Sequence, residues 1–360
     1  MNIVHILDRF DFCDGCARSV YVLAREQHRR GHRVAIAASG GDAVKLLDPL
    51  RIPFFQISEV AHETRSTTRF FAGAWKLRRY GVSARPDITH AHHYYAGNQA
   101  RLGFRGLPSA QIFTAHALIP KLGRLSLYPG ERIIGVSRAI VEDAVESFQI
   151  PRSHVSLVHN GIDRLPQQNG AAPISISGNP KHLVLSFAGR LVEEKGVFDL
   201  LRAVGMIEQR FPVRVCIAGS GPAEDGLKKI SATLRSPVSF LGVLEGVEGL
   251  LKATDILVQP SLRWEGMPMI LCEAGLAQTA VVSTTLAGIQ ELIVHEKTGL
   301  LGTPGNIDHL TANLVRLLES PPLRKNMARA LHAKIVEEMG VDAMADGVQE
   351  VYESALRANR

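Results

Sequence analysis

The sequence has no long apolar segment and few cysteines. Hydrophobic residues make up 46% of its 360 residues, yet no uninterrupted run reaches the roughly 18 apolar residues that a membrane-spanning helix needs. The first residues, MNIVHILDRF, lack the basic start of a signal peptide, and Asp8 and Arg9 end an apolar run typical of a first strand. Four cysteines do not make a disulfide scaffold in a chain of this length. We therefore expect a cytoplasmic protein.

Signatures of nucleic-acid binding are also missing. The chain shows no zinc-finger spacing, no aromatic RNA-binding signature and no long Lys/Arg run. Its formal net charge of +6 is a mild bias towards anionic partners, and by charge alone nucleic acid, an anionic membrane face and phosphorylated small molecules all fit. Because the signatures are missing, we expect no nucleic-acid partner.

What the sequence does have is a regular alternation of short apolar runs and longer amphipathic runs. This alternation predicts parallel sheets with helices on both faces. It is interrupted at residues 164–181, a stretch rich in Pro, Gly, Asn, Gln and Ser that predicts a linker. We therefore predict an α/β protein of two doubly wound domains, in which ligands bind at the carboxyl ends of the strands. The predicted domains are 1–163 plus 343–360, and 182–342.

The most informative stretch is residues 260–301. Glu265 lies in a loop with Gly and Pro, Pro268 suits the first position of a helix, and Glu273 falls in that helix's second turn. Backbone N–H groups at the helix start form an anion site, and carboxylates suit sugar and ribose hydroxyls because they accept two hydrogen bonds at once. The alternative is a solvated helix start with two surface glutamates.

Two further stretches carry glycines and basic residues after predicted strands. In SFAGRLVEEKGV, residues 186–197, Arg190 and Lys195 would emerge at the carboxyl end of a strand, where two cations can neutralise a diphosphate. An ordinary exposed loop is the alternative. The Gly-x-Gly of CIAGSGPAED is a weak signal by itself, because glycine-rich turns after strands are common.

Together these stretches resemble glycosyltransferase family 4, whose retaining enzymes have the GT-B architecture of two facing Rossmann-like domains with a cleft between them. The spacing of Glu265 and Glu273 is similar to the family's Glu-x7-Glu motif, and GRL with Lys195-Gly196 resembles a second family element. AGSGP, FLGVL, ATDILVQPS, TGLL, HNGID and GVSRAI also resemble family segments in family order.

The resemblance implies a role for each matching position. Arg190 and Lys195 would bind the donor diphosphate and stabilise the leaving group, and Glu273 would hold the ribose. The donor sugar would be held by Glu265 and His116, the latter as a catalytic histidine reaching from the other domain. The remaining donor-binding positions implied by the resemblance are Gly15, Gly219, Val243, Gly266, Met267, Pro268 and Met269.

Retaining chemistry through a protein nucleophile would need a carboxylate near the anomeric carbon. The resemblance instead implies front-face displacement, in which the departing phosphate helps to deprotonate the acceptor, so we name no nucleophile. Preorganised cations and a helix N-terminus can stabilise the negative charge that develops on the diphosphate. The chain has no Asp-x-Asp triplet, and we therefore expect an enzyme without a metal or other cofactor.

Two local patterns admit other interpretations. THAHHYYAG, residues 89–97, has three histidines that could ligate zinc. His90 and His92 would share one face of a strand and His93 the other, which favours a strand end near the acceptor. Residues 64–81 mix basic and aromatic side chains, which suits either an anionic membrane surface or a helix with its aromatics in the core.

We therefore predict a hexosyltransferase-type enzyme that moves a sugar from a nucleotide sugar, UDP-linked rather than GDP-linked, to a glycan or lipid-linked acceptor in polysaccharide biosynthesis. It would be cytoplasmic, with peripheral contact at the inner membrane face through residues 64–81 as a hypothesis. The alternatives are a nucleotide-sugar epimerase, a phosphorylase and a non-catalytic nucleotide-sugar-binding protein.

The pair Cys13 and Cys16 flanks Asp14-Gly15 at a predicted strand-to-helix turn. Such spacing can be a redox motif or half of a metal site. Zinc needs further ligands, and Cys216 and Cys272 each stand alone in predicted elements. We expect Gly15 to let the backbone approach a ligand. Because the family more often has two glycines here, the contacts of this loop stay open.

Overall fold

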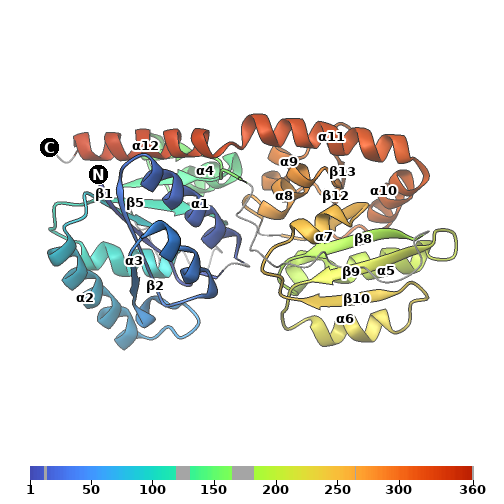
Figure 1. Cartoon of the computed structure of the whole chain (residues 1–360), viewed down its shortest axis with the longest axis horizontal. Helices are drawn as coiled ribbons and strands as arrows, with labels where there is room; N and C mark the ends of the chain where they lie inside the picture. The colour runs from blue at the N-terminus through green and yellow to red at the C-terminus, as the bar shows by residue number, and fades with distance from the viewer. Residues whose placement is uncertain (12–13, 119–129, 164–181, 264, 359–360) are drawn as a thin grey trace. The chain divides into compact units, whose positions relative to one another are not determined.

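A computed structural model describes residues 1–11, 14–118, 130–163, 182–263 and 265–358. The predicted linker, residues 164–181, and Cys13 lie outside these ranges. By its internal contacts the chain divides into a first unit of Met1–Asp163 with Gly340–Arg360 and a second unit of Arg164–Met339 (Figure 1). The second unit thus ends at Met339, whereas the sequence prediction placed this boundary at 342.

The first unit is built on a parallel sheet with helices on both faces. Its central strands bury apolar side chains together with a few polar ones such as His5 and His90, and β1 pairs with β2 on one side and with β4 on the other. The strand order in the described part of the chain is β3 (Phe54–Gln56), β2 (Arg33–Ala38), β1 (Asn2–Ile6), β4 (Ile88–Ala91), β5 (Ala110–Ala115), β6 (Arg132–Gly135) and β7 (Val155–Leu157).

Side-chain caps fix where several helices of this unit begin. Asp14, Ser66 and Ser137 each accept a hydrogen bond from a backbone N–H in the first turn that no helical carbonyl can reach. The last helix of the chain packs on the first one, so the C-terminus belongs to this unit (Figure 1). Its helices are α1 (Gly15–Arg29), α2 (Thr67–Ala84), α3 (Tyr94–Gly103), α4 (Arg138–Glu142) and α12 (Val341–Ala358).

The second unit repeats the plan with its own sheet and core. Buried Leu, Ile and Val side chains from the sheet, from α5 (Val197–Ile207) and from α10 (Ile307–Glu319) form one cluster with Met327 and Ala328 of α11 (Pro321–Glu338). Each buried Leu, Ile or Val contributes about 1.5–3 kcal/mol. The strand order is β10 (Val238–Gly242), β9 (Val213–Ala218), β8 (Leu183–Ala188), β11 (Ile256–Gln259), β12 (Ala280–Thr284) and β13 (Leu300–Gly302). The helices are α5 (Val197–Ile207), α6 (Glu224–Ser231), α7 (Glu248–Lys252), α8 (Met269–Ala277), α9 (Ala287–Leu292), α10 (Ile307–Glu319) and α11 (Pro321–Glu338).

Several boundaries differ from the sequence prediction. Pro268 was expected at the first helical position, but it has an extended ψ of 108° and is the N-cap of α8, which begins at Met269. The short elements β3, β13 and α9 were missed. Their three to six residues are too few to show a period.

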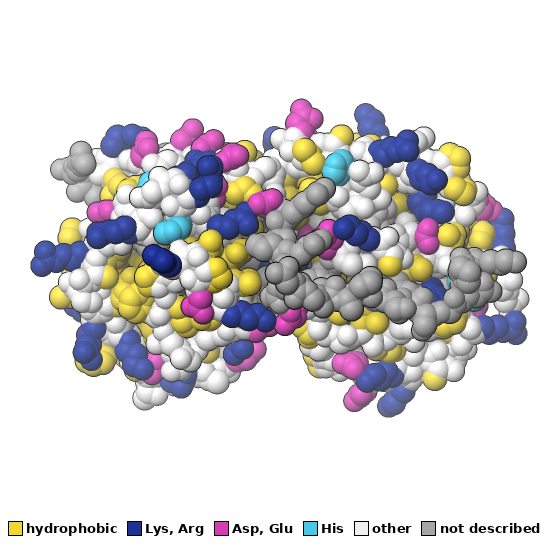
Figure 2. All heavy atoms as spheres, viewed as in Figure 1, with side chains coloured by type: hydrophobic (Ala, Val, Ile, Leu, Met, Phe, Trp, Pro, Cys, Tyr) yellow, Lys and Arg dark blue, Asp and Glu magenta, His cyan; other side chains and the backbone are white. Residues whose placement is uncertain are grey.

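None of the described helices combines the length and hydropathy that crossing a bilayer requires. Figure 2 shows one face of the molecule, on which Lys and Arg side chains are spread over both units with Asp and Glu between them. On that face the modest positive charge of the chain is therefore not gathered in a single basic patch.

Candidate functional site

The carboxyl ends of the strands of the second unit bring together most of the predicted donor-binding residues. The strand order turns at β8, where β9 lies on one side and β11 on the other. Loops that follow neighbouring strands on opposite sides of such a point diverge, and ligands of doubly wound folds bind there. Backbone hydrogen bonds link the loop after β8 to both neighbouring loops. Leu191 N–H donates to Ser220 O, after β9, at 2.8 Å, and Leu262 N–H, after β11, donates to Glu194 O at 2.8 Å.

Gly219 allows two of these loops to touch. Its φ is +129°, and a Cβ placed on it would lie only 1.9 Å from the carbonyl oxygen of Gly189. Its N–H donates to Gly242 O at 2.7 Å, while Gly189 N–H donates to Ala218 O at 3.0 Å. A side chain at Gly219 would therefore clash with backbone. The Gly-x-Gly that was weak as a sequence signal is a close contact between the loops after β8 and β9.

Lys195 and Glu265 form an ion pair at this edge. Lys195 follows β8 by one loop, and its Nζ lies 2.6 Å from Glu265 Oε1; the side chains are 22% and 5% exposed. Ser261 Oγ donates to the same oxygen at 2.6 Å. Thr284, at the end of β12, donates to Ser261 O at 2.7 Å and so fixes the loop that carries the carboxylate. The pair places a buried anion and a partly accessible cation side by side.

Glu265 is followed by the start of α8. Gly266, Met267 and Pro268 are buried, and Met269 is the first helical residue. Leu271 N–H donates to Pro268 O at 3.0 Å. The N–H groups of Met269 and Ile270 therefore lie at the start of the helix, which is the positive end of its dipole. Glu273 lies in the second turn and is 9% exposed. Neither glutamate is the solvated surface residue that the alternative interpretation required.

Two other predicted donor residues lie at the same sheet edge but are exposed. Arg190 follows Gly189 directly after β8 and is exposed. Val243 follows β10 and is 51% exposed. An exposed cation and an exposed apolar side chain at the strand ends are accessible to a ligand.

In the first unit, Gly15 is the first residue of α1, and the Asp14 carboxylate caps that helix by accepting from Cys16 N–H at 3.0 Å. Cys16 itself is buried, and burial raises the pKa of its thiol. Because the thiolate is the reactive form, a raised pKa disfavours redox chemistry at Cys16. Gly15 therefore stands at a capped helix start.

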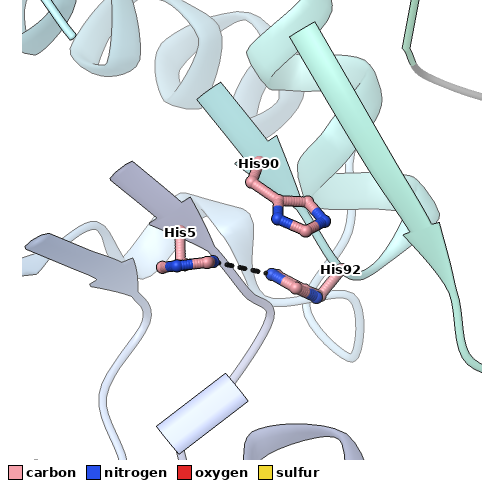
Figure 3. Close-up of side chains that lie close together, drawn as sticks. All are labelled: His5, His90 and His92. Atoms are coloured by element: carbon pink, nitrogen blue, oxygen red, sulfur yellow. Dashed lines mark hydrogen bonds between the residues drawn. The ribbon is translucent and has the colours of Figure 1, made fainter. Parts of the chain in front are cut away.

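His116, directly after β5, is half-buried and is hydrogen-bonded to a set of buried imidazoles. A hydrogen bond of 3.1 Å joins its Nε2 to His92 Nδ1, and one of 3.0 Å joins His92 Nε2 to His5 Nδ1. His90 stacks on His92 with ring centroids 4.2 Å apart, which confirms that these two side chains share a face. Figure 3 shows His5 and His92 meeting edge to edge below His90.

Burial keeps these imidazoles neutral. Desolvation lowers the pKa of His5 to about 4 and that of His116 to about 3, and it lowers the pKa values of His90 and His92 well below 6.5. Nitrogen atoms of His5, His90 and His92 lie within 4.8 Å of one another. Every ring nitrogen of these three already has a hydrogen-bond partner, so a metal ion would have to break hydrogen bonds that hold the strands together.

Sequence reasoning missed the partners of this cluster. Gln27 of α1 accepts from His5, and Tyr352 of α12 contacts both Gln27 and His90. It also missed Asp8, whose carboxylate accepts from His62 N–H at 2.6 Å just after β1. A polar residue on an otherwise apolar helix face, such as Gln27, could have indicated a buried polar contact. The sequence does not show which residue it contacts.

Comparison with known proteins identifies the family of the chain. The family model Glycosyltransferase Family 4 matches residues 13–164, and Glycosyl transferases group 1 matches residues 182–320. Together they cover most of the chain. The chain belongs to the family 4 glycosyltransferases and is a transferase enzyme.

Relatives and a solved structure extend over nearly the whole chain. An uncharacterized glycosyltransferase of Methanocaldococcus jannaschii is 26% identical over 93% of both chains. A phosphatidyl-myo-inositol mannosyltransferase of Mycolicibacterium smegmatis is 27% identical over 97% of this chain and 92% of its own. The crystal structure of HepE of Anabaena in complex with UDP-glucose has a TM-score of 0.81 at 18% identity, covering 98% of this chain and 100% of that one. The GT-B fold is thereby confirmed.

Proposed function

We propose that the protein is a retaining glycosyltransferase that moves a sugar from a UDP-sugar to a lipid-linked or polysaccharide-precursor acceptor by front-face displacement. The observation that carries the proposal is the Lys195–Glu265 ion pair beside the start of α8. In this pair, Lys195 supplies a cation that can stabilise the departing diphosphate. Glu265 supplies a carboxylate that can accept hydrogen bonds from the sugar hydroxyls.

The proposed roles follow from charge and position. Arg190 and Lys195 stabilise the negative charge that develops on the diphosphate, assisted by the N-terminus of α8. Glu273, one turn into the same helix, accepts from the ribose hydroxyls. Glu265 holds the donor sugar, with the backbone of Gly266–Met269 around it. With two cations and a helix N-terminus available, the proposed reaction does not depend on a metal ion.

The donor is supported by a comparison and by the site. HepE was solved with UDP-glucose, and the exposed Val243 and the neighbouring backbone at the end of β10 offer a surface for a base. HepE is only 18% identical, so its ligand does not identify the donor of this protein and is used as the first compound to test. The activity with GDP-linked sugars is then compared with the activity with UDP-linked sugars.

A turnover assay tests this function. Purified protein is incubated with UDP-glucose, UDP-galactose, UDP-N-acetylglucosamine and GDP-mannose, with a polyprenyl-phosphate-linked sugar or phosphatidylinositol as acceptor, with and without EDTA. We expect a UDP-sugar to react, the product to keep the donor's anomeric configuration by NMR, and EDTA to change the rate by less than about twofold. An inverted product or an epimerised donor would contradict the proposal.

The lipid acceptor is supported by helix α2. Its inner face packs Gly73, Ala74, Leu77 and Gly81 into the unit, while Phe71 and Trp75, one turn apart, are 59% and 57% exposed. Lys76, Arg78 and Arg79 are also exposed, and the Arg79 guanidinium lies over the Trp75 ring at 4.9 Å. Outward aromatics among cations suit an anionic membrane surface, and we propose peripheral attachment to the inner membrane face through this helix.

Liposome flotation tests that attachment. We expect the protein to float with vesicles containing anionic phospholipid at low salt and to be released at high salt. Phe71→Ser with Trp75→Ser should abolish flotation. Val336→Ser, which removes a similarly exposed apolar side chain in the second unit, should leave it intact. Equal flotation of both variants would contradict a role for α2.

A further inference from the structure

One oxygen of the Glu265 carboxylate has two hydrogen-bond donors, which differ in how firmly they are held. Lys195 Nζ and Ser261 Oγ each lie 2.6 Å from Glu265 Oε1. The Lys195 ammonium ends a flexible stem, and its side chain is 22% exposed. Ser261, by contrast, is fully buried. The accessible cation can turn to a ligand, whereas the buried hydroxyl stays with the carboxylate.

The backbone around Ser261 is anchored to two neighbouring elements. Thr284 Oγ1, at the end of β12, donates to Ser261 O at 2.7 Å. The next residue, Leu262, donates its N–H to Glu194 O at 2.8 Å. The oxygen of a serine side chain is placed by a single torsion with three staggered positions. On an anchored backbone, the position of Ser261 Oγ is therefore well defined.

Charge fixes the direction of the hydrogen bond between Ser261 and Glu265. A carboxylate paired with an ammonium has no proton to donate, so the Ser261 hydroxyl donates to it. The lone pairs of Ser261 Oγ remain to accept, and Nε2 of the buried Gln259 lies 3.4 Å away. A reversed Gln259 amide would set its oxygen against these lone pairs. Ser261 is thus a donor to the carboxylate, with the amide nitrogen of Gln259 behind it.

A second donor matters because the proposed function takes the first one away. In that function Lys195 stabilises the diphosphate, so its charge moves from Glu265 towards the ligand. A buried carboxylate that loses its only partner is strongly destabilised, and it would compete with the diphosphate for the ammonium. Ser261 supplies a partner that the ligand does not remove.

We infer that Ser261 is a positioning residue that holds the Glu265 carboxylate in place while the Lys195 ammonium turns to the donor diphosphate. The inference rests on the proposed function for the role of Lys195, and its residues all lie in the second unit. No described residue donates a hydrogen bond to Glu265 Oε2, so the held carboxylate keeps that oxygen for a sugar hydroxyl. Ser261 should therefore influence diphosphate binding only through Glu265.

Calorimetric titration with UDP measures this dependence in a double-mutant cycle. We expect Ser261→Ala to raise the Kd for UDP about three- to tenfold, because the unsupported carboxylate competes with the diphosphate for Lys195. In Glu265→Ala no carboxylate competes, so UDP should bind at least as tightly as it does to the wild type. Adding Ser261→Ala to Glu265→Ala should then change the Kd by less than about twofold.

Ser283→Ala is the matched control. Ser283 is also buried at the carboxyl edge of this sheet, but its hydroxyl donates to Gln259 O at 2.6 Å rather than to the carboxylate. The substitution should lower the urea midpoint much as Ser261→Ala does, yet leave the Kd for UDP within about twofold. An equal loss of UDP binding in both serine variants would overturn the specific role of Ser261.

The outcomes separate this inference from the proposed function. Normal UDP binding by Ser261→Ala, or an equal loss in the Glu265→Ala background, overturns the positioning role while the proposed function stands. If the wild-type protein binds neither UDP nor UDP-glucose, the proposed function fails, and with it the turn of Lys195 to a diphosphate. Urea unfolding of the same set of proteins without ligand still decides whether Ser261 holds Glu265. Non-additive midpoints support that hydrogen bond, and additive midpoints overturn it.

Discussion

The carboxyl edges of the two sheets carry different chemical groups, although both units have the same type of fold. In the second unit the edge holds charge: a buried carboxylate, a lysine within 2.6 Å of it and a helix N-terminus. In the first unit the edge holds neutral imidazoles whose pKa values burial keeps far below 6.5. One edge thus carries paired charges, and the other carries neutral hydrogen-bonding groups.

This difference shows how each edge is kept stable without a ligand. Glu265 is stabilised by Lys195 and Ser261, which share its Oε1 atom, because a buried charge needs a partner. The histidines need no counter-ion, but each N–H must find an acceptor. Substitutions in the second unit should therefore act through charge or close backbone contact, and those in the first through proton position.

The largest effect is expected from Glu265→Gln. The amide keeps the size of the side chain and can still accept from Ser261, but it loses the charge opposite Lys195. We expect kcat to fall about 100-fold or more, with little change in the unfolding midpoint. Glu194→Gln, which removes an exposed carboxylate paired with Arg263 at 3.2 Å, should keep activity within about twofold. Unchanged turnover in Glu265→Gln would remove its catalytic assignment.

A stability effect of about 2–4 kcal/mol is expected from Gly219→Ala. The new Cβ would meet Gly189 O at 1.9 Å in a left-handed backbone conformation, so the loops after β8 and β9 must separate. Gly246→Ala is the control, since a Cβ there meets no described atom within 4 Å. Urea unfolding measures both variants. Equal midpoints would show that the loop contact does not constrain the edge.

The charged edge was largely readable from sequence. Local spacing placed Glu265, Glu273, Arg190 and Lys195 at strand and helix ends, where the structure has them. The ion pair itself was not predicted, because it joins loops 70 residues apart. Role assignments at these positions stay predictions.

The neutral edge was readable only in part. Period-two alternation put His90 and His92 on one face, as found. Tyr352, however, contacts Gln27 across 325 residues and His90 across 262, and no local pattern encodes such partners. The alternation of apolar and amphipathic runs predicted two doubly wound units correctly, because it extends over many residues. Strands of three residues carry no period.

A pH effect on stability of about 1.4 kcal/mol per pH unit for each of these histidines should distinguish the units. The imidazoles of His5, His90, His92 and His116 have folded pKa values below the 6.5 of the unfolded chain. Between those values the unfolded state binds more protons, so stability is full above pH 6.5 and falls as the pH is lowered towards about 4.

His90→Gln should reduce the slope of unfolding free energy against pH by about 1.4 kcal/mol per pH unit between pH 5 and 6, because it removes one imidazole that titrates only when unfolded. His154→Gln, at an exposed histidine of the same unit, is the control and should leave the slope unchanged. Urea titrations at several pH values give both slopes. The same slope in wild type and His90→Gln would mean that His90 is protonated in the folded protein.

The smallest effect is expected for the pair Cys13 and Cys16, of which Cys16 lies beside the neutral edge. Cys16 Sγ lies 4.0 Å from the carbonyl oxygen of His92, and burial raises the pKa of its thiol, so at neutral pH it is an uncharged filler of the core. A serine hydroxyl can donate to the same carbonyl, and Cys13→Ser with Cys16→Ser should keep kcat/KM within about twofold. Abolished activity in that double variant would mean that a thiol takes part in transfer. The first unit would then hold a reactive group, and its edge could no longer be described by neutral hydrogen bonding alone.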